Sequence, residues 1–181
     1  PKENLRLTRK FAAEHIAAMD KAGELFYSEE NFDDFYIGKG STYPDIQGSI
    51  GILFEQASSR GLRYANDRVS RHFRDTIANQ LRLSLSSIRA ASQQRESILK
   101  LQVDFFKDAL QTAEKHDVKA YLLQGSPSRL SAAVKTLRAH TVQVQSPKAE
   151  FEHAGKKYSP KDTVLISLSQ PQHFLIRSVM E

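Results

Sequence analysis

Apolar residues recur every three or four positions in three long stretches, which is the period of a helix with one buried side. These stretches cover residues 7–23, 70–91 and 95–115. Gly23 supplies a stop signal for the first helix. The polar triplet Ser92-Gln93-Gln94 separates the other two, so they are either two helices or one long helix with a kink. The expected buried rows are Leu7, Phe11, His15, Ala18, Met19, Ala22 and Leu25 in the first, and Phe73, Ile77, Leu81, Leu85 and Ile88 in the second.

Short apolar runs bounded by turn residues predict strands. Residues 50–54 form such a run between Gly48 and Ser58, too short for a helix. Residues 62–67 are ambiguous between a loop and a short strand. Beyond residue 115 we expect strands at 118–123, 141–145 and 163–168, a helix at 128–140, a hairpin at 150–158 and a last helix after Pro171. The strand–helix–strand order over 118–145 is that of a βαβ unit, and therefore predicts a parallel sheet.

One carboxylate, Glu55, directly follows the predicted strand at 50–54. In α/β sheets the carboxyl ends of strands form the crevice where ligands bind. A glutamate held there partly out of water would have a raised pKa, in the range useful for moving protons. The simpler interpretation is a solvated glutamate at a strand end. The irregular segment 27–48 precedes it, and loops of that length inside compact domains are usually functional.

The stretch from Phe35 to Gly61 has a long and specific sequence, in which Phe35-Tyr36-Ile37 is followed by residues 38–45 and 48–61. It resembles the end of the catalytic domain in bacterial zinc carboxypeptidases of the carboxypeptidase A type. The resemblance extends back through residues 7–23 and forward to about residue 95. It implies that Glu55 is the general base and acid, which activates the attacking water and then passes the proton to the leaving amine. The implied substrate is a peptide with a free C-terminus.

The same resemblance implies a set of substrate contacts in the loop before Glu55. The family uses a mobile tyrosine that hydrogen-bonds the peptide, and both Tyr36 and Tyr43 match its position. The sequence does not decide between these two. The pocket for the terminal side chain is expected at Gly40, Ser41 and Thr42.

Zinc chemistry needs three protein ligands and an open position for water. The family takes them from a His-x-x-Glu pair and a later histidine, all before the catalytic glutamate. Only His15 precedes Glu55, and no His-x-x-Glu is present. His72 and Asp75 could share a helix face, but two such ligands are a weak signal and follow Glu55. We therefore expect no metal ligands in this chain, with zinc and the upstream catalytic half belonging to a longer parent.

The predicted fold class is α/β, divided near residue 115. Residues 1–69 would be the tail of a zinc-carboxypeptidase-like domain, 70–115 a helical connector, and 116–181 a small βαβ-type domain. The last part resembles, in architecture, the beginning of a class I glutamine amidotransferase-like domain. That chemistry needs a nucleophilic cysteine. The chain has no cysteine, so the resemblance implies a structural or docking role.

Composition and charge limit the classes of protein and the kinds of partner that fit this chain. The absence of cysteine excludes a disulfide framework, and no apolar run reaches transmembrane length. The net charge of +5 concentrates in eight arginines: Arg60, Arg63, Arg68, Arg71, Arg74, Arg82, Arg89 and Arg95. Because aromatic residues are scarce there, a solvated basic face is expected rather than a nucleic-acid or membrane partner.

Two alternatives to a peptidase fragment remain open. The first is a non-catalytic basic helical module that binds a partner, and the second is a degenerate family member kept for recognition. A cut through a catalytic domain would also expose surfaces meant to be covered, which favours self-association.

Overall fold

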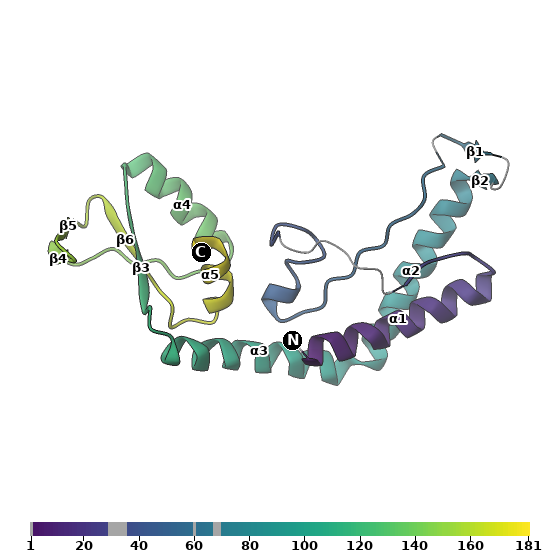
Figure 1. The fold of residues 1–181 in the computed structure, drawn as a ribbon, viewed down its shortest axis with the longest axis horizontal. Helices are drawn as coiled ribbons and strands as arrows, with labels where there is room; N and C mark the ends of the chain where they lie inside the picture. The colour runs from purple at the N-terminus through teal and green to yellow at the C-terminus, as the bar shows by residue number, and fades with distance from the viewer. Residues whose placement is uncertain (1, 29–35, 60, 67–69) are drawn as a thin grey trace. The chain divides into compact units, whose positions relative to one another are not determined.

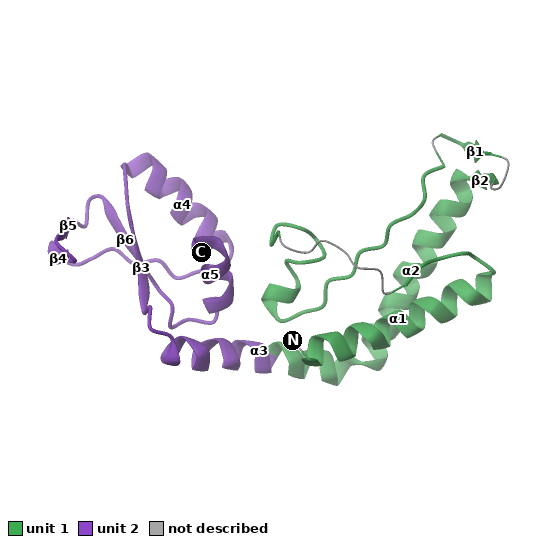
Figure 2. Ribbon diagram, viewed as in Figure 1, with its two compact units in different colours: residues 1–102 green, residues 103–181 purple. Residues whose placement is uncertain are grey.

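In the computed structural model, residues 2–28, 36–59, 61–66 and 70–181 are described. The chain folds into two compact units, residues 1–102 and 103–181 (Figure 2). Both units combine helices with two-stranded antiparallel sheets, so the mixed α/β class predicted from the sequence is confirmed.

The first unit is built on two long helices, α1 (Lys2–Ala22) and α2 (Phe73–Gln93), which pack against each other (Figure 1). The short helix η1 (Asp45–Gln47) and the strands β1 (Arg63–Ala65) and β2 (Ser70–His72) complete it. β1 and β2 are antiparallel, which resolves the ambiguous segment 62–67 as containing a short strand. Four residues of the expected α1 row are buried, namely Leu7, Phe11, His15 and Met19.

The prediction for the buried side of α2 is wrong. All five apolar residues of its expected row are exposed, and the buried positions are Thr76, Asn79, Ser86 and Ala90. Small and polar side chains let α1 approach closely and bond across the interface, as His15 does with Ser86. Ion pairs from Arg82 to Glu24 (3.9 Å) and Arg89 to Glu14 (3.7 Å) flank this contact.

The strand predicted at residues 50–54 is also absent. Residues 50–59 run as an extended segment between η1 and β1 (Figure 1). Among the described residues, no backbone–backbone hydrogen bond involves residues 52–57. A strand is defined by its ladder with a neighbour. The apolar run therefore has the conformation of a strand but no partner among the described residues.

Helix α3 (Arg95–Lys115) follows α2 after a single intervening residue, Gln94. The N–H of Gln94 donates to the carbonyl of Ala90, and the N–H of Ile98 donates to the carbonyl of Gln94. Helical hydrogen bonds therefore continue through the polar triplet, and the break between the two predicted helices is confined to Gln94.

The second unit pairs β3 (Ala120–Gln124) with β6 (Thr163–Ser167), with α4 (Pro127–Ala139) and α5 (His173–Met180) beside them. Its other sheet is the hairpin of β4 (Phe151–His153) and β5 (Lys156–Tyr158), as predicted. The core of the unit contains Leu137, Val142, Ile166, Leu168, Leu175 and Ile176.

The parallel βαβ sheet expected in this part is contradicted, because β3 and β6 are antiparallel. Residues 141–145 contribute only a single bridge, between Gln145 and Leu165. The N–H of Gln143 donates instead to the side chain of Gln170 at 2.7 Å, so this segment forms no ladder with β3. The more apolar β6 takes the place beside β3.

Candidate functional site

A buried polar contact fixes the position of the segment that carries Glu55. The His15 Nδ1 atom on α1 lies 2.7 Å from the Ser86 hydroxyl on α2. Because that hydroxyl donates to the Leu83 carbonyl at 2.9 Å, the Nδ1–H of His15 is the donor to Ser86. Burial lowers the pKa of His15, so the ring is neutral near pH 7.

The other side of the His15 ring holds the extended segment. Phe54 meets it edge-to-face, with ring centroids 4.9 Å apart and an interplanar angle of 88°. The exposure of side chains alternates along residues 53–57: Phe54 and Gln56 are half-buried, while Leu53, Glu55 and Ala57 are exposed. Alternation with a period of two is the geometry of an extended backbone. Anchoring Phe54 inward therefore turns Glu55 outward.

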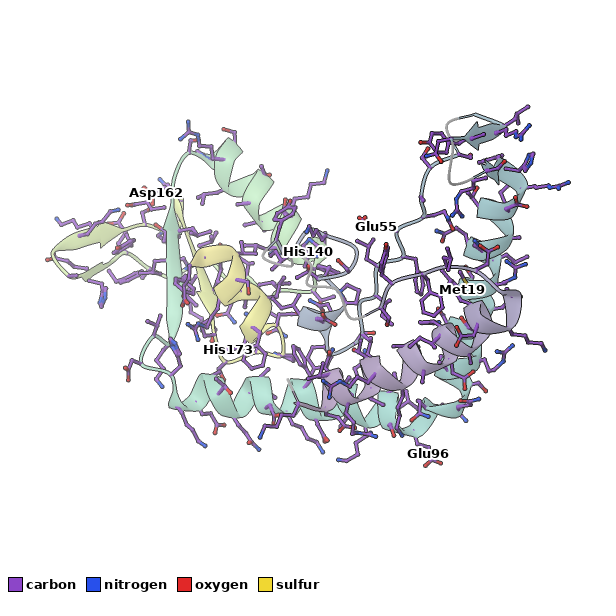
Figure 3. All side chains as sticks on the ribbon, turned by 45° about the vertical axis from the view of Figure 1, so that its right-hand side comes forward. Met19, Glu55, Glu96, His140, Asp162 and His173 are labelled. Carbon is purple, nitrogen blue, oxygen red and sulfur yellow. The ribbon has the colours of Figure 1, made fainter. Side chains whose placement is uncertain are left out.

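Glu55 lies on this segment in the first unit (Figure 3). Among the described residues, none forms a hydrogen bond or ion pair with its carboxylate. The expected partial burial of Glu55 is not found, because no strand in the described part of the chain covers the segment. The carboxylate is open to solvent and available to a ligand.

The loop before Glu55 is fastened to α1 by Asp45. Its Oδ1 atom accepts hydrogen bonds from the Asn4 side chain (3.0 Å) and from the N–H of Gly51 (2.9 Å). Asn4 also donates to the carbonyl of Ser49 at 2.9 Å. Sequence reasoning missed Asn4 and Asp45. An aspartate among turn residues, shortly before two glycines, was the available signal, because aspartate side chains often bond nearby backbone N–H groups.

The predicted substrate residues share one tight turn. The N–H groups of Thr42 and Tyr43 both donate to the carbonyl of Lys39, and the N–H of Lys39 donates to Tyr36. Gly40 is exposed and Thr42 half-buried, but Ser41 is buried, so its side chain does not line an open pocket. The turn touches the Glu55 segment where the Ser41 carbonyl meets Gly51. A Cβ atom at Gly51 would lie 1.5 Å from that oxygen.

The two candidate tyrosines differ in exposure. Tyr36 is 68% exposed, and its ring lies over Gly38, where a Cβ atom would come within 2.5 Å of the ring. Tyr43 is half-buried. Tyr36 therefore has the freer side chain, and Gly38 provides the space for its ring.

Metal-ligating side chains do not converge in the part of the chain that the structure describes. No three His, Cys, Asp or Glu residues there come together in a way that could hold an ion. His72 precedes the first turn of α2, where its N–H donates to the Asp75 carboxylate at 3.2 Å. This pair caps the helix. Within the described residues, no helix has the length and apolarity needed to cross a bilayer.

No family model, curated protein or solved structure matches this chain. Assignment of a function therefore depends on the residues themselves and their arrangement.

Proposed function

We propose that this chain is part of a zinc metallocarboxypeptidase-like hydrolase, which removes C-terminal residues from peptides. In this proposal, residues 1–69 are the tail of the catalytic domain, with Glu55 as the general base. The observation that carries it is the arrangement of Phe54 and Glu55, in which the ring is held by His15 and the carboxylate projects, unpaired among the described residues, into solvent. The resemblance assigns the catalytic role to Glu55 by its position in the sequence, directly after the apolar run at 50–54.

Glu55 would act by moving one proton. Its carboxylate takes a proton from the water that attacks the scissile carbonyl, and then delivers that proton to the leaving amine. General acid–base catalysis of this kind contributes ~10²–10⁴-fold to a rate. The residues described here do not form a zinc site, so the ion and its ligands belong, in this proposal, to the upstream catalytic half.

Substrate contacts would come from the turn that touches the Glu55 segment. Gly40 and Thr42 line the pocket for the terminal side chain, and Tyr36 or Tyr43 hydrogen-bonds the peptide. The exposure of Tyr36 favours it over Tyr43, because a tyrosine that closes over a ligand must be free to move.

The extended segment provides the place where the upstream half would join. Backbone groups of residues 52–57 form no backbone–backbone hydrogen bond among the described residues. An extended backbone with unpaired N–H and C=O groups is a template for another strand. A strand from the upstream half would pair here and bring its zinc ligands toward Glu55. The second unit would then be an appendage with a structural or docking role.

The experiment that tests this proposal is a peptidase assay of the full-length polypeptide with Glu55→Gln, run beside Glu96→Gln as a control on the exposed start of α3. Loss of turnover only in Glu55→Gln supports the proposal. A second candidate function, a non-catalytic binding module, is favoured by the exposed apolar face of α2.

A further inference from the structure

Helix α2 presents a row of apolar side chains that nothing among the described residues covers. The row recurs every three or four residues, and each member is between 49% and 66% exposed: Phe73, Ile77, Leu81, Leu85 and Ile88. It extends over about 22 Å of the helix, at 1.5 Å per residue. An uncovered, contiguous apolar strip of this kind marks an interaction site. We refer to these five residues as the α2 surface.

The charges beside the α2 surface are positive. Helix α2 contains three arginines and a single carboxylate, Asp75. Arg74 lies on the same side of the helix as Leu81; its side chain is 83% exposed, and its ion pair with Asp75 is long, at 3.5 Å. Arg82 and Arg89 border the row; Arg82 pairs with Glu24, just after α1, and Arg89 pairs with Glu14 of α1. A complementary partner therefore carries carboxylates beside its apolar residues.

A hollow lies at the first turn of α2, with a volume of about 320 Å³. Its lining is mostly apolar and consists of Leu62, His72, Phe73, Arg74 and Ile77. A hollow of this composition accepts a protruding apolar side chain and places a carboxylate next to Arg74. Two of the three arginines of α2 are already paired with Glu24 and Glu14, so the helix lacks the row of unpaired cations that anionic lipids attract, which favours a protein partner over a membrane.

Like charges disfavour a second copy of this chain as the partner. In an antiparallel pair centred on Leu81, Arg74 of one copy would approach Arg89 of the other. In a parallel pair each Arg74 would meet its own counterpart. Like charges brought together across an interface oppose association.

We propose that the α2 surface binds an amphipathic helix of a protein partner, whose apolar side chains pack along the row while its carboxylates face Arg74. Helix-in-groove recognition uses anchors at this spacing. The inference is independent of the peptidase proposal and stands if Glu55 has no catalytic role.

The test uses two synthetic peptides of about six helical turns. Both peptides carry leucines at alternating three- and four-residue spacing. In the first peptide glutamates flank the leucines, and in the second peptide a lysine replaces every glutamate. Binding to the 181-residue chain is measured by calorimetry. We expect the glutamate peptide to bind at least tenfold more tightly. Leu81→Gln should weaken that binding roughly tenfold, whereas Leu99→Gln, an exposed control on α3, should leave it unchanged.

Arg74→Glu provides the charge test, because it should reverse the preference between the two peptides. Circular dichroism of each variant establishes that the helices are retained. Equal binding of both peptides, or binding of neither, would overturn the proposal. So would binding only to phosphatidylglycerol vesicles, or a self-association that Leu81→Gln abolishes while the glutamate peptide fails to bind.

Discussion

The His15 Nδ1 atom and the Ser86 hydroxyl, 2.7 Å apart, join α1 to α2 inside the first unit. The same ring packs against Phe54, so this contact also sets the direction of the Glu55 segment. Among the described residues, the second ring nitrogen, Nε2, is buried without a hydrogen-bond partner. The position of Glu55 thus depends on a neutral, buried histidine.

Removing the hydroxyl tests this dependence. Ser86→Ala would leave the Nδ1–H of His15 buried and unsatisfied, which costs about 1–3 kcal/mol. We expect a corresponding loss in the free energy of unfolding by urea, followed by circular dichroism. Ser84→Ala is the matched control, since Ser84 is exposed on the same helix. A loss no larger in Ser86→Ala than in Ser84→Ala would contradict the role given to this contact.

The second unit should lose stability in mild acid. His173 is fully buried, and this burial lowers its pKa. The hydrogen bond with the Leu168 carbonyl opposes this effect. The nearby Arg177 and His116 lower the pKa further. Because the folded pKa lies below the ordinary value of 6.5, the unfolded state binds more protons as pH falls below that value. The contribution of His173 to the stability of the second unit is therefore fully present above about pH 6.5, and it is lost as the pH falls below that value.

The pH effect is measured as the urea midpoint between about pH 7.5 and 5. His15 has a lowered pKa for the same reason and contributes in the first unit. His173→Gln should make the second unit's stability less dependent on pH, whereas His153→Gln, in the exposed hairpin, should not. Glu181, whose carboxylate is held by Arg177 and Tyr121 at a pKa of about 2, stays charged throughout this window. An unchanged slope in His173→Gln would exclude His173 as the cause.

Gly51 permits the close approach of two backbones. Gly51→Ala would drive its Cβ atom into the Ser41 carbonyl, and overpacking of this kind costs about 1–3 kcal/mol. We expect a lower thermal midpoint and shifted amide resonances for residues 39–45. Gly40→Ala is the control, because no atom lies within 4 Å of the added methyl group. Equal thermal midpoints for the two variants would show that the turn does not meet Gly51 in this way.

Asp45 should hold the loop before Glu55 in place. Asp45→Ala removes the acceptor for Asn4 and for the N–H of Gly51, while Asp45→Asn keeps one side-chain oxygen. We expect faster proteolysis within residues 39–51 in the alanine variant and a smaller increase in the asparagine variant. Cleavage at the native rate in Asp45→Ala would remove Asp45 from this role.

Local patterns predicted the helices well, because periodicity and stop signals act over a few residues. α3 spans the residues expected for it, and α1, α4 and the β4–β5 hairpin lie within a few residues of their predicted positions. The pairing of strands was harder to predict from the sequence. The run at 50–54 is apolar and extended, but a strand also needs a neighbour, and sequence alone does not show which one is present. For the same reason Thr163–Ser167, and not residues 141–145, pairs with β3.

The buried face of α2 was mispredicted because apolarity normally marks the core side of a helix. Here α1 packs on the smaller residues Ser86 and Ala90, and the larger apolar residues remain outside. Sequence patterns singled out Glu55 and the loop at 36–43 as the candidate site, and in the structure the Ser41 carbonyl of this loop meets Gly51 of the Glu55 segment. The hydrogen bond between the Asn4 and Asp45 side chains joins residues 41 positions apart, and no local pattern reveals such a contact.

The most direct test of the central proposal is the turnover of Glu55→Gln in the full-length polypeptide, on a peptide with a free C-terminus. We predict a fall in kcat of ~10²–10⁴-fold, with zinc content and thermal midpoint unchanged, because the amide cannot accept the proton. Glu96→Gln should keep full activity. Near-normal turnover in Glu55→Gln, in a preparation where Glu96→Gln is also active, would contradict the assignment of Glu55 as the general base.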